Sequence, residues 1–119
     1  MTLYFEVVRT GSTRTVILTK NYAIKIPNCQ TWRTFLKGLL ANDQERDCWR
    51  MKHPLLCPVL FALPTGLFIV MPRARNLTHE EWLSMDIDDL DTEGLLVEKK
   101  IDSWGKLDGR FVAVDYGNL

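Results

Sequence analysis

The amino-acid sequence predicts an α+β fold, in which short antiparallel strands and one long helix share a core. Short runs of β-branched and aromatic residues alternate with turn-forming residues, a pattern typical of antiparallel strands. One apolar pattern with helical spacing, at residues 31–51, is long enough for a helix of several turns. A chain of 119 residues fits a single domain, 1–119, with a modest core.

Three predicted strands open the chain and form a meander. They are LYFEVV at 3–8, RTVILT at 14–19 and YAIKIP at 22–27. Lys25 lies in the third of these strands among apolar neighbours. An unpaired ammonium against an apolar face is costly, so an inward-facing Lys25 needs a carboxylate partner or an anionic ligand. The alternative is an edge strand whose lysine points to water and discourages edge pairing.

The predicted helix at 31–51 carries large apolar residues at roughly helical spacing, from Trp32 to Met51. Gly38 and the polar run ANDQERD weaken its middle, so two shorter helices are the alternative. The helix is expected to end before Pro54, because a residue that precedes proline avoids the helical region.

Two hairpins are predicted in the second half of the chain. The runs 56–63 and 67–71 are expected as strands, joined by a Pro-Thr-Gly turn. Asp108 and Gly109 form a strong hairpin signal before the apolar strand FVAVDY at 111–116.

A short helical part is predicted between these hairpins. Thr78 and Glu81 have the spacing of a capping box, which indicates a helix start. The acidic run DIDDLDTE at 86–93 lacks the glycine that a calcium loop requires, and we interpret it as a solvated helix start. The run LLVEKKI at 95–101 is expected to continue that helix.

The charge and hydropathy of the sequence limit the classes of function that it can have. Lys and Arg together number 15, as do Asp and Glu, so the formal net charge is zero. A general binder of nucleic acid or of anionic membranes carries a basic excess, so nucleic-acid binding through Arg73, Arg75 and nearby cations ranks low. No apolar stretch approaches the length of a membrane span, and the first residues do not resemble a signal peptide.

The three cysteines are an odd number and include no CxxC pair, which favours a reduced, cytoplasmic protein. A zinc site built from Cys48, His53 and Cys57 lacks both a standard spacing and a fourth ligand. We therefore interpret these residues as parts of the core or surface.

The element order and several motifs resemble the protein-kinase fold over nearly the whole chain. YAIKIP resembles the third-strand motif of that family, with Lys25 at the phosphate-contacting position. NDQERDCWRMKHPLLCPVL resembles the long helix and fourth strand, with Glu45 as the carboxylate that pairs with the lysine. The resemblance implies a five-stranded antiparallel sheet with one long helix over 1–73. A reduced helical part and a C-terminal β-hairpin, a vestige of the second lobe, would follow over 74–119.

The same resemblance extends to the cofactor site. LFIVMPRA resembles the fifth strand and hinge, with Met71 at the gatekeeper position. By position, the Pro72 carbonyl and the Ala74 amide would hold adenine. VDYGN resembles the Asp-Phe-Gly motif, which makes Asp115 the magnesium ligand. The segment SWGKLDGRFVAVDYG closely resembles small, divergent kinase-like proteins of phages and bacteria. ATP and magnesium are the cofactors that this resemblance implies.

Several departures from the family pattern argue against catalysis. The loop after the first strand has one glycine, Gly11, where the family has three. Glu98 falls at the position of the catalytic base, and Ser103 at that of the second metal ligand. Phosphoryl transfer depends on positioning and on charge stabilisation by metal ions, so these replacements are serious.

The resemblance and its departures together imply a catalytically inactive, pseudokinase-like protein that acts by protein–protein interaction. A phage-encoded inhibitor or modulator of a host protein would fit this description. A reduced second lobe would expose apolar surface that marks an interface, and self-association through the same surface is also expected. The candidate residues for that surface are Trp82, Leu95, Leu96, Trp104 and Tyr116. The alternative for these residues is that they close a small core of their own.

Two further functions use the same cleft. A minimal ATP-dependent phosphotransferase or nucleotidyl transferase would use Lys25, Glu45 and Asp115, with Glu98 as its base. An ATP-binding switch without chemistry would use the first three residues alone.

Overall fold

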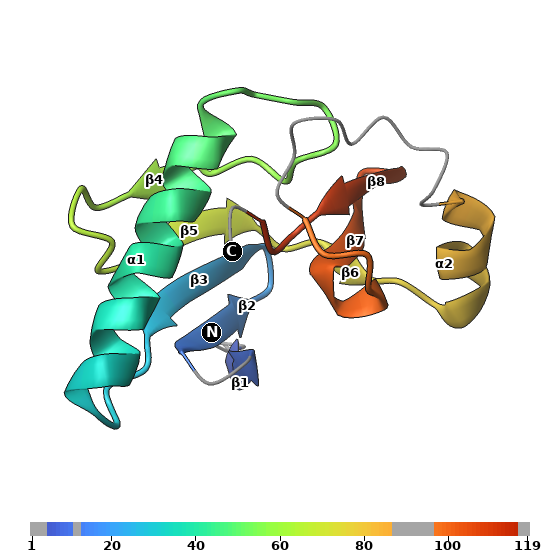
Figure 1. The fold of residues 1–119 in the computed structure, drawn as a ribbon. Helices are drawn as coiled ribbons and strands as arrows, with labels where there is room; N and C mark the ends of the chain where they lie inside the picture. Colours follow the sequence, from blue (N-terminus) through green and yellow to red (C-terminus); the bar gives the residue numbers. More distant parts are fainter. Residues whose placement is uncertain (1–4, 11–12, 87–96, 117–119) are drawn as a thin grey trace.

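The computed structural model describes residues 5–10, 13–86 and 97–116 and has an α+β fold, as predicted (Figure 1). A five-stranded antiparallel sheet has the order β1-β2-β3-β5-β4. Its strands are β1 (Phe5–Thr10), β2 (Arg14–Thr19), β3 (Tyr22–Pro27), β4 (Phe61–Ala62) and β5 (Ile69–Pro72). The meander predicted for the start of the chain is therefore confirmed, and β2 and β3 begin and end where the sequence pattern placed them.

A second sheet of three antiparallel strands has the order β6-β7-β8. Its strands are β6 (Arg75–Asn76), β7 (Trp104–Leu107) and β8 (Arg110–Ala113), and a 3₁₀ helix over Ile101–Ser103 precedes β7. The predicted hairpin joins β7 to β8, and Asp108 and Gly109 both have positive φ, at 50° and 82°. Two positive φ values in a two-residue loop match the twist of the flanking strands. The sequence pattern did not predict β6.

The long helix α1 (Trp32–Trp49) is continuous and lies across one face of the five-stranded sheet (Figure 1). Thr31 caps it, and Thr34 bonds back to the Thr31 backbone, so the first amides of the helix are satisfied. Gly38 lets the helix approach β3 closely, because a Cβ atom there would lie 2.7 Å from the Cα of Pro27. Gly38 therefore supports the helix packing, and the alternative of two shorter helices is wrong.

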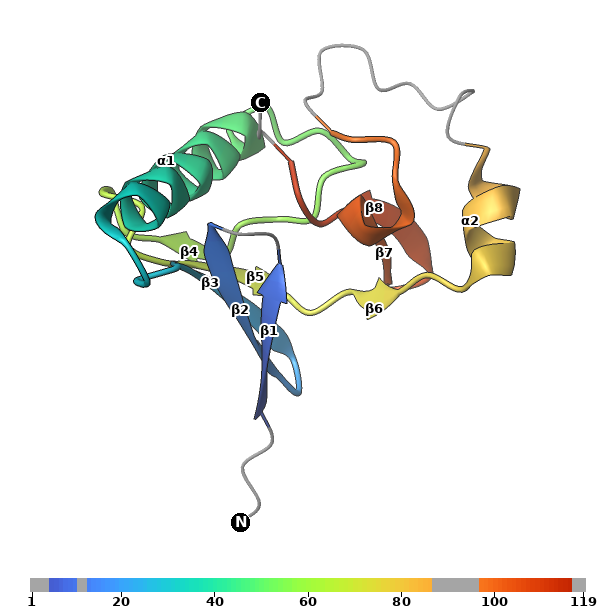
Figure 2. The same ribbon diagram turned by 60° about the horizontal axis from the view of Figure 1, so that its bottom comes forward.

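The short helix α2 (His79–Met85) begins as predicted, with Thr78 and Glu81 forming the capping box. In Figure 2 the three-stranded sheet lies beside the five-stranded sheet, and α2 lies beyond it. Residues 97–100 are not helical, so the expected helix at 95–101 is wrong for its described part. Most of the acidic run 86–93 lies outside the described residues.

The strand predicted at 56–63 is reduced to β4. Leu56 forms an isolated bridge to Ala113 instead, and the Cys57 amide donates to the Ala113 carbonyl at 2.9 Å. This segment therefore uses backbone groups to join the second sheet before it reaches the first. The physical reason is tertiary: Pro58 cannot donate to a strand ladder, and the neighbouring amide finds its acceptor across the domain.

One cluster of buried apolar side chains draws on both sheets. Its members are Leu56, Cys57, Ile69, Met71, Leu77, Met85, Trp104, Val112, Ala113 and Tyr116. The predicted boundary between residues 73 and 74 falls between β5 and β6, and the cluster spans it. Among the described residues, no helix is both long and apolar enough to cross a membrane.

Candidate functional site

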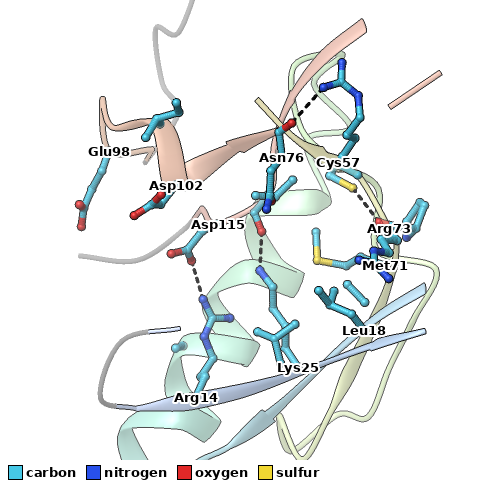
Figure 3. Close-up of a pocket in the computed structure, with 18 of the residues that line it drawn as sticks. Arg14, Leu18, Lys25, Cys57, Met71, Arg73, Asn76, Glu98, Asp102 and Asp115 are labelled. Carbon is cyan, nitrogen blue, oxygen red and sulfur yellow. Dashed lines mark hydrogen bonds and ion pairs between the residues drawn. The ribbon is translucent and has the colours of Figure 1, made fainter. Parts of the chain in front are cut away.

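A cleft of about 1410 Å³ is lined by residues of both sheets (Figure 3). Six residues that the sequence analysis assigned to a nucleotide site line this one cleft: Lys25, Met71, Pro72, Ala74, Glu98 and Asp115. They come from β3, from the end of β5 and the turn after it, and from segments before β7 and after β8. Residues up to 90 positions apart in the chain therefore meet in one place.

Lys25 points inward and is buried. Its ammonium donates to Oε1 of Glu45 and to the backbone carbonyl of Val114. Burial lowers the pKa of Lys25, and the Glu45 carboxylate offsets part of that effect. The interpretation of Lys25 as an exposed edge-strand residue is therefore wrong, and the pairing with Glu45 that the resemblance implied is present.

Glu45 reaches the network from α1, and its side chain is 0% exposed. Its second oxygen, Oε2, accepts a hydrogen bond from Nη1 of Arg14 at 2.6 Å. Glu45 lies beneath the cleft, where both carboxylate oxygens are held by cations from the sheet. A buried charge needs this kind of compensation, because water cannot reach it to solvate it.

Arg14, the first residue of β2, is the member of this network that the sequence analysis missed. Its Nη2 atom donates to Oδ1 of Asp115 at 2.5 Å (Figure 3). One guanidinium therefore joins Glu45 to Asp115. Burial alone lowers the pKa of Arg14, but the two carboxylates outweigh burial and raise it. The result is two cations and two anions in mutual contact.

Asn42 completes the buried network and was also missed. Its Oδ1 accepts from Nη1 of Arg14 at 3.2 Å, and its Nδ2 donates to the backbone carbonyls of Lys25 and Gly66, at 3.1 and 2.9 Å. The sequence contains one signal for Asn42. The spacing of Gly38, Asn42 and Glu45 places all three residues on the same face of α1, so Asn42 is expected beside the buried carboxylate.

The residues fit the apolar part of a nucleotide better than they fit a magnesium ion. Val16, Leu18, Ala23 and Met71 line the cleft and offer apolar surface to a planar ring. One Asp115 oxygen, Oδ1, accepts from the Arg14 guanidinium, whose positive charge would repel a metal ion at the same carboxylate. We therefore derive no chemistry through a metal at this site.

The remaining positions taken from the resemblance differ in accessibility. Glu98 is exposed at the cleft and pairs with Lys100 at 3.1 Å. Ser103 is buried, and its carbonyl accepts from the Val114 amide at 2.8 Å; it does not line the cleft. The Pro72 carbonyl accepts a weak hydrogen bond from the Cys57 thiol, at 3.6 Å.

Several residues proposed for an exposed partner surface lie elsewhere. Trp104 and Tyr116 are buried in the shared core, so the expectation that they are exposed is wrong. The Tyr116 hydroxyl donates to the Cys57 carbonyl at 2.7 Å, and burial raises its pKa strongly. Trp82 is half-buried against the core, and Leu95 and Leu96 lie outside the described residues.

The described residues contain no group of three or more His, Cys, Asp or Glu side chains that could hold a metal ion. The chain was compared with family models, with curated proteins and with solved structures, and it matches none of them.

Proposed function

We propose that this protein is a catalytically inactive, kinase-like protein that acts by binding another protein, as an inhibitor or modulator of its partner. The observation that carries the proposal is the bridge from Arg14 to Asp115. A phage-encoded modulator of a host protein is the form of this function that the resemblance favours.

The bridge argues against phosphoryl transfer. Transfer requires a carboxylate that is free to hold a metal ion and a base that can reach the acceptor hydroxyl. One oxygen of Asp115 is already paired with Arg14 at 2.5 Å, and Glu98 lies at the exposed rim beside Lys100. The four charges of the network, three of them buried, sum to zero, so the network itself offers a triphosphate no uncompensated cation.

Exposed apolar side chains support protein binding. Ten large apolar residues of the described part of the chain are exposed, in the first sheet, in both helices and in connecting segments: Val7, Tyr22, Trp32, Leu36, Leu40, Met51, Leu60, Phe61, Leu67 and Leu83. Single exposed apolar residues are ordinary, whereas groups of them mark interaction sites. Trp32, Leu36 and Leu40 share one helix. Phe61 lies in the edge strand β4, with Leu60 just before it and Leu67 in the segment that leads to β5.

A nucleotide-binding switch is the second candidate, and the apolar bed of Val16, Leu18, Ala23 and Met71 beside Lys25 favours it. Calorimetric titration with ATP, with and without magnesium, separates the two candidates. Our proposal predicts no saturable heat up to millimolar ATP, for the wild type and for Asp115→Asn alike. Saturable binding that Lys25→Ala and Asp115→Asn both abolish, with circular dichroism unchanged, would instead establish the switch.

The same samples test catalysis and partner binding. We expect no transfer of labelled phosphate from ATP to protein or small-molecule acceptors, in the presence of magnesium or manganese. A photo-crosslinking residue at Phe61 or Leu36 should then capture a discrete partner from host lysate, while one at the exposed Asp108 should not. Equal capture from all three positions would argue against a specific protein-binding surface.

A further inference from the structure

One face of α1 carries three large apolar side chains that the fold does not use. Trp32, Leu36 and Leu40 are 78%, 57% and 57% exposed, and each lies four residues from the next. This spacing places them in one row along the helix, which we call the α1 stripe. The buried residues of the helix, among them Ala41 and Glu45, lie on its opposite side.

The start of the stripe is ordered by local contacts. The ring of Trp32 packs edge-on against Phe35, with ring centroids 5.8 Å apart. A hollow of about 410 Å³ lies beside this pair, and it is lined also by Cys29, Gln30 and Thr31. An exposed tryptophan next to a hollow offers a partner both a large apolar contact and a pocket, and tryptophan is enriched among the residues that dominate protein interfaces.

The charges beside the first turns of the stripe are of one sign, and Asp43, beyond its last residue, pairs with Arg46. Arg33 and Lys37 are exposed, and neither forms an ion pair with any residue that the structure describes. Residues 32–42 contain no Asp or Glu, and the positive end of the helix dipole adds to the field of the two cations. The flank of the stripe therefore attracts acidic groups.

This charge pattern argues against a second copy as the occupant. In a two-fold pairing of two α1 stripes around Leu36, the cations at 33 and 37 of one copy would face those of the other. Like charges placed together in an interface disfavour the pairing. An occupant with apolar residues and flanking carboxylates satisfies both properties of this surface.

We propose that the α1 stripe binds an amphipathic helix of a partner protein, whose apolar face is flanked by Asp or Glu residues. The proposal rests on the protein-binding function proposed above, and it names the chemistry of the partner. Apolar anchors of the partner pack on Trp32, Leu36 and Leu40, and its carboxylates pair with Arg33 and Lys37. Lys37 and Leu40 also line the cleft, so the bound helix lies at the cleft mouth.

A display library tests the proposal without any knowledge of the natural partner. The probes are helical peptides with leucines fixed at i, i+3, i+4 and i+7, and with Glu, Lys or Ser randomised at the flanking positions. The wild type should enrich glutamate at these flanks, and Leu36→Glu should reduce retention at least tenfold. The double variant Arg33→Glu/Lys37→Glu should enrich lysine instead.

The matched control is Leu83→Glu on α2, a residue that is 65% exposed, and it should enrich the same peptides as the wild type. Circular dichroism checks that each variant is folded. The inference fails if the wild type enriches no acidic flank, if Leu36→Glu retains the same peptides, or if charge reversal leaves the preference unchanged. Because no nucleotide is present, these outcomes are separate from the ATP titration that tests the inactive kinase-like assignment.

Discussion

Removal of the Glu45 carboxylate should destabilise this protein more than removal of any exposed charge. Glu45 is 0% exposed, and its two oxygens accept from Arg14 and from Lys25. In Glu45→Met, two buried cations keep only Asp115 as an anionic partner in the network, and that side chain is 32% exposed. Loss of one partner from a buried ion pair costs about 3–5 kcal/mol, because the other charge stays buried without compensation. This is a large part of the roughly 5–15 kcal/mol that holds a domain folded.

A second substitution makes the prediction specific to charge balance. In Lys25→Met/Glu45→Met, one cation and one anion are lost together, and Arg14 still pairs with Asp115. Methionine has nearly the length of both replaced side chains, so the buried volume is kept. We expect the double variant to be more stable than Glu45→Met alone, with a coupling of at least about 2 kcal/mol between the two sites.

Urea unfolding, followed by tryptophan fluorescence and far-UV circular dichroism, measures Lys25→Met, Glu45→Met, the double variant and the wild type. Coincident transitions with a constant m-value justify the comparison of free energies. If the two single substitutions add within about 0.5 kcal/mol, the sites are independent and the charge-balance argument is wrong. Asp108→Asn, at an exposed turn, is the matched control and should change the stability by less than about 0.5 kcal/mol.

Three further predictions test other parts of the structure. Gly66→Ala should lower the free energy of unfolding by more than Gly109→Ala, which should cost about 1–2 kcal/mol. Both glycines have positive φ, but only at Gly66 would the added methyl group overlap an α1 carbonyl. Equal losses of stability in urea unfolding would refute this prediction. At pH 8 the thiol of Cys57 should react with Ellman's reagent only at the rate of unfolding and last of all the thiols, because burial raises its pKa to about 11. Hydrogen bonds from Arg75 hold the pKa of Glu81 well below 4.5, so the stability that ionised Glu81 provides is complete above that pH and is lost as pH falls. Glu81→Gln should therefore flatten the fall in unfolding free energy between about pH 5 and pH 2, and an unchanged slope would contradict the assignment.

The strands that were predicted well are those that local patterns determine. β2 and β3 are short runs rich in β-branched residues between clear turns, so their bounds follow from the sequence pattern. The run at 56–63 is equally apolar, but its backbone amides bond to Ala113 and Val70 in two different sheets. A periodicity of two cannot distinguish these destinations, because it reports which faces are apolar and contains no information on the partner strand.

The site was predicted only in part, because a local sequence pattern contains no information on contacts that are distant in the chain. Lys25 and Glu45 were found because they lie in recognisable motifs, whereas Arg14 follows a polar loop at the start of a strand and looks exposed from its neighbours. Its burial depends on Asp115, which is 101 positions away in the chain. Asn42 belongs to the polar run that is expected to weaken the helix, yet it lies on the buried face and bonds to two backbone carbonyls. Both residues owe their roles to contacts that are distant in sequence.

The position of the buried charges indicates what they do for the fold. Arg14 and Lys25 belong to the first sheet, and their acceptors Asp115 and the Val114 carbonyl directly follow β8 of the second sheet. These two cations therefore bond the segment after β8 to the first sheet, beside the core contacts that Tyr116 makes. A network that holds two sheets together cannot release Asp115 for a metal ion without loosening that junction. Structural use of these charges and catalytic use of them are thus in competition, and the bridge through Arg14 favours the structural use.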